Sequence, residues 1–558
     1  MASATNLRSR RSAGQLYALA GVEREIRAQD THNRRKYLRE YGDAFRTYDS
    51  LLDSPQLQSA MHAADVVLIG DYHALPAAQR YAASVVEQRA LAGGRPVVLG
   101  VETIFARDQH ILDEWWRREI DESELRQRIR FDLDWGYDWT PFYELLATAR
   151  DHAEGVYGLD CMPREDLRKI GARDRHAAAK IAEIRQRHPG AAIFVLFGES
   201  HLAPGHLPRV LHKEMPGTRI LTVLQNVDAL YWRAAGESAD KVEAVRVRED
   251  VLCVFNATPL EKYESYRLLL DQWSRCEDSP DFAPTIYNLI DSLVRFLEID
   301  RYSSHNGTQP KFLVDMMPEV YGGSSDAMLR RLLSRKGISE PETESLLGQV
   351  EQRGSTYLSR VNAFYVREFQ MLHVAEDAAR FLHQACQGLP RRWNAGVTDQ
   401  NQSAEKCAPA TAIDAFYARI VEHAVAYFGT RLLCPSRPAQ DGEDSGLLSR
   451  AACDKAAQSA VRGDDLHKVE ASAQEWGYRI GSHIYDAYLA GKVKPSGLRR
   501  LFLAHLEEPG LARKVCAAVI AKARALSRTA RSSHIPPLED ATLDIARLNA
   551  ERRLLSAS

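Results

Sequence analysis

Short apolar runs alternate with longer amphipathic stretches between about residues 60 and 275. The runs have the length of strands, and the stretches between them have the length and the apolar spacing of helices. This alternation is typical of a parallel sheet covered by helices. The apolar runs predict strands at Val66–Ile69, Pro96–Val101, Val156–Leu159, Ile193–Phe197, Ile220–Leu224 and Val251–Phe255. The amphipathic stretches predict helices at Ala77–Ala92, Arg107–Glu119, Glu122–Arg128, Pro141–Ala153, Arg173–Gln186 and Leu207–Glu214.

The pattern changes to a helical period after Trp273. One face of the first predicted helix there carries Ile286, Leu289, Ile290, Leu293 and Leu297. One short strand is expected at Lys311–Val314, and the remaining pattern predicts long helices at Thr356–Gln387, Ala410–Leu433, Asp465–Ala490 and Gly510–Leu526. We therefore expect an α/β domain with a mostly parallel sheet flanked by helices, followed by a mainly α-helical domain.

The length of 558 residues exceeds what a single hydrophobic core usually organises, so more than one domain is expected. Residues 1–58 predict a flexible or helical N-terminal segment. Residues 59–278 predict the α/β domain, residues 279–530 the helical domain, and residues 531–558 a polar tail.

Charge and composition limit which partners and which cellular location are expected. With 73 Lys and Arg against 75 Asp and Glu, the chain has no excess of positive charge that would favour nucleic acid. No stretch of about 18 consecutive apolar residues suggests a membrane span, and the N-terminus has no convincing signal peptide or lipid-accepting cysteine. The eight cysteines are scattered without a Cys-x-x-Cys pair, which favours reduced thiols. These features predict a cytoplasmic protein.

Candidate chemistry lies where the predicted strands end. The first strand runs into Gly70 and then His73, and the fourth runs into Gly198 and then His201, so that Gly-x-x-His occurs twice. Glu102 follows the second strand and Asp160 the third. Because the carboxyl ends of parallel strands share one edge, these side chains are expected to converge there.

The residues leave three interpretations open. His73, Glu102 and His201 are a ligand set for zinc, manganese or iron. Without a metal, one histidine acts as a general base oriented by Glu102 or Glu199, while the other steadies an oxyanion. A purely structural role is the third, in which Asp71, for example, caps the following helix.

A surrounding group of polar residues is expected to support the site. Arg173 and Asp174 lie at a predicted helix N-terminus near the same edge, and Arg173 is placed to pair with Glu102 or a ligand carboxylate. Asp71, Asp160 and Glu199 complete this supporting set.

Several motifs resemble one family in their order and spacing. They are Gly-x-x-His, "VLGVE" followed by Gln109 and "ILDEWWRREIDESEL", "WGYDWTPFYELLATAR", "VYGLD", "GARDRHAAAKI" and the second Gly-x-x-His. Together they resemble the ChaN-like haem-binding uptake family of the Tiki superfamily, which also includes TraB-like and erythromycin-esterase-like proteins. The resemblance covers roughly residues 55–275. It implies an α/β fold with His73, Glu102 and His201 in the site.

The resemblance implies more than one possible function, because members of the superfamily differ in what they do. ChaN-like proteins are associated with haem or iron handling, Tiki-like relatives are metal-dependent proteases, and esterase-like relatives use a His and Glu pair without a known metal. Haem binding would need an axial ligand, Tyr72 or His73, and a broad apolar face shared across a homodimer. The chain departs from the family in having Asp71 where Glu usually follows the first glycine, and in lacking the export signal of lipoprotein members.

The first hypothesis is thus a ChaN-like protein that binds haem or a divalent metal, iron, zinc or manganese, at the sheet edge. The alternatives are a metal-dependent hydrolase, Tiki-like or erythromycin-esterase-like, acting on a small molecule or peptide, and a non-catalytic interaction protein. His373 and Glu376 in the helical half have a reversed Glu-x-x-His order and predict ordinary helix packing.

Overall fold

The computed structural model describes residues 2–30, 36–161, 170–237, 242–275, 280–300, 313–323, 325–387, 412–439, 453–458, 466–504, 506, 510–518 and 520. Contacts divide the chain into two compact units, one of Glu25–Leu270 and one of Met1–Arg24 with Asp271–Ser558. No helix within the described ranges has both the length and the apolar character to cross a membrane. The six cysteines that lie in those ranges are thiols and not members of disulfides.

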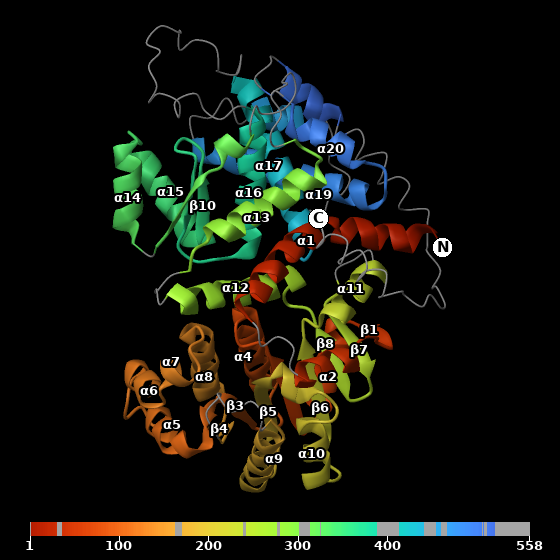
Figure 1. Cartoon of the computed structure of the whole chain (residues 1–558), viewed down its shortest axis with the longest axis vertical. Helices are drawn as coiled ribbons and strands as arrows, with labels where there is room; N and C mark the ends of the chain where they lie inside the picture. Colours follow the sequence, from red (N-terminus) through yellow and green to blue (C-terminus); the bar gives the residue numbers. More distant parts are fainter. Residues whose placement is uncertain are drawn as a thin grey trace. The chain divides into compact units, whose positions relative to one another are not determined.

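The unit Glu25–Leu270 is built on an eight-stranded sheet with the strand order β1-β7-β8-β6-β2-β5-β3-β4 (Figure 1). Neighbouring strands from β8 to β4 are parallel, whereas β7 is antiparallel to both β8 and β1. The strands are β1 (Ser50–Leu52), β2 (Val66–Asp71), β3 (Val97–Phe105), β4 (Gly155–Asp160), β5 (Ala192–Gly198), β6 (Ile220–Gln225), β7 (Ala244–Arg248) and β8 (Val251–Val254). The predicted α/β class and all six predicted strands are confirmed.

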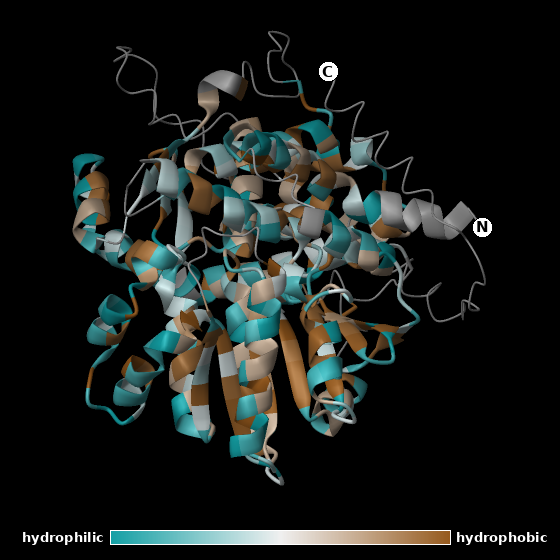
Figure 2. Cartoon of the chain, turned by 60° about the horizontal axis from the view of Figure 1, so that its bottom comes forward, coloured by the Kyte–Doolittle hydropathy of each residue, from teal (hydrophilic) through white to brown (hydrophobic). Residues whose placement is uncertain are grey.

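Two strands were missed. Strand β1 has only three residues and two of them are exposed, while β7 alternates Val with partly exposed Arg. Both lie at the antiparallel side of the sheet, where one face meets water and no continuous apolar run is needed. The central strands are apolar along their length because helices cover both faces, and every residue of β2 and β5 is buried. Figure 2 shows these strands as hydrophobic ribbons among helices with hydrophilic outer positions.

The helices of this unit agree closely with the predicted ones. Helices α6 (Glu122–Arg128) and α10 (Leu207–Glu214) match to the residue. The remaining helices are α2 (Lys36–Ala44), α3 (Ser54–Ala63), α4 (Pro76–Leu91), η1 (Ala106–Asp108), α5 (Gln109–Trp116), α7 (Phe131–Asp134), α8 (Trp139–His152), α9 (Ile170–Arg187), η3 (Glu199–Leu202), α11 (Asp228–Glu237) and α12 (Pro259–Arg275).

The second unit is mainly helical and contains a small sheet. Its helices are α1 (Ala2–Gln29), α13 (Ala283–Phe296), η4 (Leu313–Met316), α14 (Asp326–Arg335), α15 (Glu340–Arg353), α16 (Met371–Gln387), α17 (Ala412–Leu433), α19 (Leu466–Leu489) and α20 (Pro495–Phe502). Helix α1 crosses the division, and its first part joins this unit because Asn288 donates a hydrogen bond to the carbonyl of Ala18 and Tyr488 to that of Arg10. The sequence instead placed residues 1–58 in one segment. The division into four predicted segments stays a prediction.

The predicted helix Thr356–Gln387 is wrong in its first half. Strands β10 (Ser355–Leu358) and β11 (Ala363–Val366) form an antiparallel hairpin, and β9 (Glu319–Gly322) pairs with β11 in parallel. The hairpin turns at Asn362, whose φ of 50° interrupts any helix, and its strands are rich in the β-branched and aromatic residues that favour strands. The single strand predicted at Lys311–Val314 is also wrong, because its described part belongs to η4.

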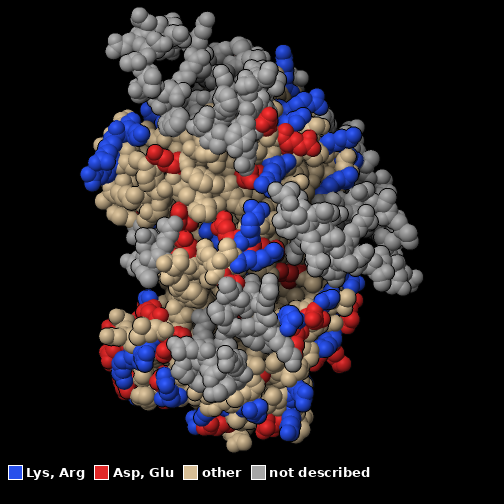
Figure 3. All heavy atoms as spheres, viewed as in Figure 1, with Lys and Arg blue, Asp and Glu red and all other residues tan. Residues whose placement is uncertain are grey.

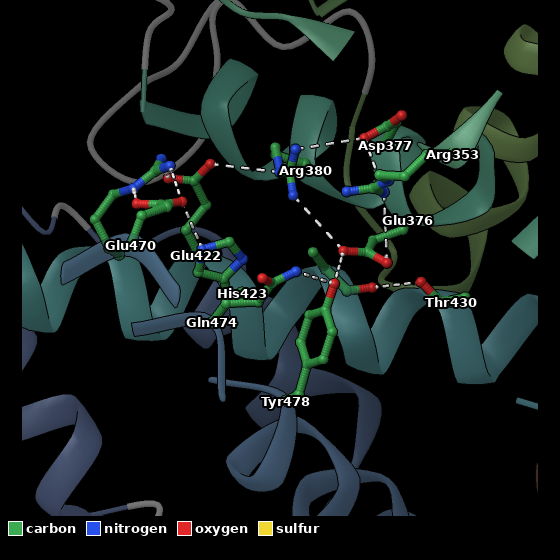
Figure 4. Close-up of polar contacts among 12 residues, drawn as sticks. Arg353, Glu376, Asp377, Arg380, Glu422, His423, Thr430, Glu470, Gln474 and Tyr478 are labelled. Atoms are coloured by element: carbon green, nitrogen blue, oxygen red, sulfur yellow. Dashed lines mark hydrogen bonds and ion pairs between the residues drawn. The ribbon is translucent and has the colours of Figure 1, made fainter. Parts of the chain in front are cut away.

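A buried ion-pair network connects the helices of this unit (Figure 4). Glu376 accepts a hydrogen bond from Tyr478 at 2.5 Å and lies 3.0 Å from Arg437 and 3.6 Å from Arg353 and Arg380. Residues Asp377, Glu422, Arg419, His423 and Glu470 extend the network along α16, α17 and α19. The helix that carries His373 and Glu376 was predicted to pack against its neighbours. In the structure it is a core helix whose buried Glu376 forms ion pairs.

Candidate active site

Four neighbouring strands deliver the predicted site residues to one edge. Strands β2, β5, β3 and β4 are adjacent in that order, so the residues at their carboxyl ends come together. His73 follows β2, and His201 lies in η3, directly after β5. Asp160 is the last residue of β4.

Glu102 lies within β3 and not after its end, which corrects the predicted boundary. The pairing of β3 with β4 shifts register between Val101 and Phe105, so that the stretch holding Glu102 bulges out of the ladder. Gly158 permits this bulge, because a Cβ atom there would lie 2.7 Å from the carbonyl oxygen of Ile104. A bulge changes the direction in which side chains point. Glu102 lies inside this irregular stretch of β3 and is buried.

The structure brings His73, Glu102 and His201 together. Nε2 of His73 lies 3.7 Å from Oε2 of Glu102, and Nε2 of His201 lies 3.7 Å from Oε1 of the same carboxyl group. The two imidazoles thus lie near the same carboxylate, each beside a different oxygen. The side chain of His73 is 15% exposed and that of His201 only 4%, so the site is reached from the side of His73.

A buried arginine keeps Glu102 ionised. Nη2 of Arg173 lies 2.5 Å from Oε1 of Glu102, and the same guanidinium holds Asp160 through bonds of 3.0 and 2.7 Å. Oε2 of Glu102 accepts the backbone N–H of Gly198. Although burial raises the pKa of Glu102, Arg173 and the two histidines lower it to about 2. The predicted pairing of Arg173 with Glu102 is therefore present.

Each histidine is oriented by its own aspartate. Nδ1 of His73 lies 2.6 Å from Asp71, and Nδ1 of His201 lies 2.6 Å from Asp174. A carboxylate only accepts hydrogen bonds, so Nδ1 is the donor in both pairs and Nε2 is directed at Glu102. The orienting role predicted for Glu102 or Glu199 stays a prediction, while the partners of Nδ1 in the structure are Asp71 and Asp174.

Glu199 belongs to a separate ion pair beside the site. Its two carboxylate oxygens accept hydrogen bonds from Nζ of Lys262 at 2.9 and 3.0 Å, and the hydroxyl of Tyr41 lies 3.5 Å away. Burial raises the pKa of Glu199, which Lys262 opposes. Sequence reasoning missed Lys262 and Tyr41, because they come from α12 and α2 and no local motif marks them.

Tyr72 is packed into that same region. Nζ of Lys262 lies 4.7 Å from the centre of its ring, and Tyr266 contacts the ring edge on. Burial, together with the negative charge of Glu199, raises the pKa of Tyr72 well above its ordinary value of 10.

Aromatic side chains surround the imidazole of His73. Trp135, Tyr137 and Phe142 lie with ring centres 5.5, 5.1 and 6.4 Å from it. All three come from the segment between β3 and β4 that contains "WGYDWTPF". All three side chains are buried, so they pack the imidazole of His73 into the apolar core beside the charged groups of the site.

The residues do not fit a divalent metal as they are arranged. Both oxygens of Glu102 already accept hydrogen bonds, one from Arg173 and one from Gly198. Within the described part of the chain, no group of three or more His, Cys, Asp or Glu side chains is placed to hold a metal ion. A metal-ligand role for His73, Glu102 and His201 stays a prediction.

Comparisons with known proteins found similarities to part of the chain. A family model described as haem-binding uptake, Tiki superfamily, ChaN, matches residues 57–188. A solved structure of cofacial heme binding to ChaN of Campylobacter jejuni is similar at 12% identity and a TM-score of 0.25, over 31% of this chain and 86% of that one. The type III effector HopBA1 is similar at 15% identity and a TM-score of 0.28, over 38% and 96%. The comparison with curated proteins found no match.

The matched residues include His73, Glu102, Asp160, Arg173 and Asp174 but end before His201. The resemblance inferred from the sequence motifs is confirmed over this range. Residues 57–188 are thus similar to the haem-binding uptake family of the Tiki superfamily, ChaN.

Proposed function

We propose that the unit Glu25–Leu270 is a hydrolase in which His73 and His201, which both face Glu102, carry out acid–base chemistry without a metal. The observation that carries this proposal is the convergence of both Nε2 atoms on Glu102, each at 3.7 Å. Imidazole bases oriented by a carboxylate are the usual means of moving a proton in hydrolysis.

The electrostatics favour a bound water at this point. With Nδ1 donating to an aspartate, a neutral imidazole presents the lone pair of Nε2, and Glu102 is ionised. A water molecule can donate one hydrogen to an imidazole and the other to the carboxylate. Such a water is held and polarised by acceptors alone, which prepares it to attack a carbonyl carbon.

The proposed reaction is hydrolysis of an ester or amide. One imidazole takes a proton from the water at Nε2 as the water oxygen bonds to the carbonyl carbon. The bond to the leaving group then breaks, and the proton passes to that group or to solvent. Arg173, whose side chain is only 2% exposed, keeps Glu102 charged and does not touch the substrate.

Two chromogenic substrates test the proposal, p-nitrophenyl acetate for ester cleavage and a peptide p-nitroanilide for amide cleavage. We expect the metal-free protein to hydrolyse one of them, and His73→Ala and Glu102→Gln to reduce the rate by about 100-fold or more. His110→Ala is the matched control, because His110 is exposed and its Nδ1 lies 3.2 Å from the carbonyl oxygen of Arg107, outside the proposed site. Helical content measured by circular dichroism should be unchanged in all three variants.

Two results would overturn the proposal. If activity disappears on dialysis against a chelator and returns with zinc, manganese or iron, the chemistry depends on a metal. If neither substrate is cleaved under any condition, the site is not a general hydrolytic centre.

A second candidate function is haem binding, favoured by the family match over residues 57–188. His73 fits an axial ligand better than Tyr72, because Asp71 fixes its Nδ1 and leaves Nε2 as the nitrogen that would bind iron. The side chain of His73 is 15% exposed, which leaves part of it open to a ligand.

A haem titration followed by absorbance separates this candidate from the first. We expect a Soret shift that saturates and is lost in His73→Ala but kept in Tyr72→Phe. A shift that survives in His73→Ala would rule out His73 as the ligand. Size-exclusion chromatography of the haem-loaded protein tests the predicted homodimer.

A further inference from the structure

The aspartate that orients His73 is itself held by a buried amide. Oδ2 of Asp71 lies 2.6 Å from Nδ1 of His73, and Oδ1 of Asp71 accepts a hydrogen bond from Nε2 of Gln79. The reversed amide would place its oxygen against a carboxylate oxygen, so the donor side of Gln79 must face Asp71. Asp71 is 2% exposed and Gln79 is completely buried. The carboxylate thus receives one hydrogen bond on each oxygen, away from bulk water.

Gln79 lies among small and apolar buried residues of α4, which include Ala78, Ala82 and Val86. Oε1 of Gln79 is buried and has no hydrogen-bond partner among the described residues. A buried carbonyl oxygen without a partner costs free energy, so an apolar side chain would be more stable at this position. We attribute the presence of an amide to the bond that its other half makes with Asp71.

A second amide holds the backbone on both sides of this contact. Nε2 of Gln225, the last residue of β6, donates hydrogen bonds to the carbonyl oxygen of Gly70 at 2.7 Å and to that of Ala78 at 3.1 Å. These two residues directly precede Asp71 and Gln79 in the chain. Because one buried side chain ties both segments to the same strand, the aspartate and the amide are kept at a fixed separation.

The imidazole of His73 lies between two carboxylates. Nδ1 is 2.6 Å from Asp71, and Nε2 is 3.7 Å from Oε2 of Glu102. A neutral imidazole carries one N–H, and an ionised carboxylate can only accept, so the two acids compete for the same proton. A hydrogen bond to an ionised carboxylate favours that form, and Gln79 gives such a bond to Asp71. Without it, Asp71 takes up a proton more readily and can then donate to Nδ1, which places the imidazole N–H on Nε2.

We infer that Gln79 is a positioning residue, which by donating to Asp71 keeps the N–H of neutral His73 on Nδ1 and the lone pair of Nε2 directed into the site. The proposed hydrolase needs this lone pair to take a proton from water, so the effect on the rate rests on that function. The position of the N–H does not depend on it. Gln79 itself does not touch the substrate and transfers no proton, because an amide does not titrate near neutral pH.

His201 has a different support and serves as an internal reference. Oδ1 of Asp174 lies 2.6 Å from Nδ1 of His201, and Oδ2 lies 3.1 Å from Nδ1 of His206. Nε2 of His206 lies 3.3 Å from Oε2 of Glu40. The aspartate of His201 thus faces a second imidazole where the aspartate of His73 faces an amide. Removing that amide should therefore change the ring nitrogens of His73 and leave those of His201 unchanged.

Nitrogen NMR of the full chain with isotope-labelled histidine rings reports where each N–H lies. The signals of His73 are those that disappear in His73→Ala. At mildly alkaline pH, where an ordinary imidazole is neutral, we expect His73 of the wild type to carry its N–H on Nδ1. In Gln79→Met, whose side chain has nearly the same length but no N–H donor, the N–H should lie wholly or partly on Nε2. A wild-type His73 with its N–H on Nε2, or with both nitrogens protonated, would overturn the inference, as would an unchanged His73 in Gln79→Met.

The hydrolysis rate is the second readout, with whichever of the two chromogenic substrates the wild type cleaves. Gln79→Met should lower the rate by about 10- to 100-fold. Val86→Ala is the matched control, because it removes buried side-chain volume from the same helix without removing a hydrogen-bond donor. At a temperature well below unfolding it should keep the wild-type rate. Equal losses in the two variants would mean that Gln79 acts only through stability.

Gln79→Glu makes the same contact depend on pH, and it keeps the test decisive if Gln79→Met does not fold. A protonated carboxyl group can donate one hydrogen bond to Asp71, whereas an ionised one donates none and repels it. The rate of this variant relative to wild type should therefore fall as the pH rises, which a purely structural role of Gln79 would not produce. A ratio that stays constant across the pH range would contradict the inference.

The two readouts separate this inference from the proposed function. If the wild type cleaves neither substrate, the hydrolase is wrong, and the ring nitrogens still decide the role of Gln79. If the wild type is active and Gln79→Met has the wild-type rate, only the role of Gln79 in the reaction is wrong.

Discussion

Nη2 of Arg173 lies 2.5 Å from Oε1 of Glu102, and both side chains are at most 3% exposed. Arg173 also holds Asp160, so a single guanidinium compensates two buried carboxylates. Removing one member of such a group leaves uncompensated charge in a low-dielectric place, which costs more than the pair itself contributes.

The first prediction follows from this pairing. Arg173→Ala should lower the free energy of unfolding by roughly 3 to 5 kcal/mol, measured by urea denaturation. Arg126→Ala is the matched control, since Arg126 pairs with Asp132 while both side chains are about half exposed, and it should cost at most about 1 kcal/mol. An Arg173→Ala protein as stable as the control would mean that Glu102 and Asp160 are solvated.

The second prediction concerns the space between the histidines. A Cβ atom on Gly198 would lie 2.9 Å from Oε2 of Glu102 and 3.4 Å from Nε2 of His73. Gly198→Ala should therefore reduce ester hydrolysis by about tenfold or more through displacement of these groups. Gly205→Ala, where the added atom meets nothing within 4 Å, should retain the wild-type rate. Equal rates for the two variants would show that the reaction does not use this space.

The third prediction is a pH dependence of the helical unit. Burial raises the pKa of Glu376, but Arg353, Arg437 and Arg380 lower it to about 2, below its ordinary value of 4.5. The folded chain then binds fewer protons than the unfolded chain, so this stabilisation is complete above pH 4.5 and is lost as the pH falls towards 2.

Urea denaturation between neutral pH and pH 3 tests this sign. Glu376→Gln should be less stable than wild type at neutral pH, and the difference should shrink as the pH falls. Glu475→Gln removes an exposed partner of Arg479 and should leave the pH dependence unchanged. A constant difference between Glu376→Gln and wild type at all pH values would contradict the prediction.

The fourth prediction concerns the close packing of α17 on α19. A Cβ atom on Gly477 would lie 2.4 Å from Cβ of His423 and 2.8 Å from the carbonyl oxygen of Ile420. Gly477→Ala should lower the free energy of unfolding by about 1 to 3 kcal/mol, because the two helices must separate. Gly348→Ala, in α15 with open space around it, should instead raise it by about 0.5 to 1 kcal/mol. Thermal unfolding of the two variants and the wild type measures whether each substitution lowers or raises the stability.

The surface charge of the described residues is mixed in sign. Basic and acidic side chains of the described residues are interspersed over the face shown in Figure 3. This agrees with the near-balance of 73 basic and 75 acidic residues in the sequence. Absence of nucleic-acid binding stays a prediction.

Much of the sheet could be predicted because its strands are buried on both faces. The runs that begin at Val66 and Ile193 contain apolar residues without interruption, as expected for strands buried on both faces. The glycines and histidines that follow mark where each strand ends. The hairpin Ser355–Val366 could not be separated from the helix that follows it, because a short apolar run has no clear period of its own.

The sequence by itself determined the six strands of the sheet that read as continuous apolar runs, and the arrival of His73, Glu102 and His201 at one edge. Only the tertiary structure decided which acid each histidine bonds to. Asp174, His206 and Glu40 are on different elements, and the distance between such side chains depends on how helices pack and not on their separation in the chain. The bulge in β3 was equally hidden, because it arises from pairing with β4, a strand more than fifty residues away.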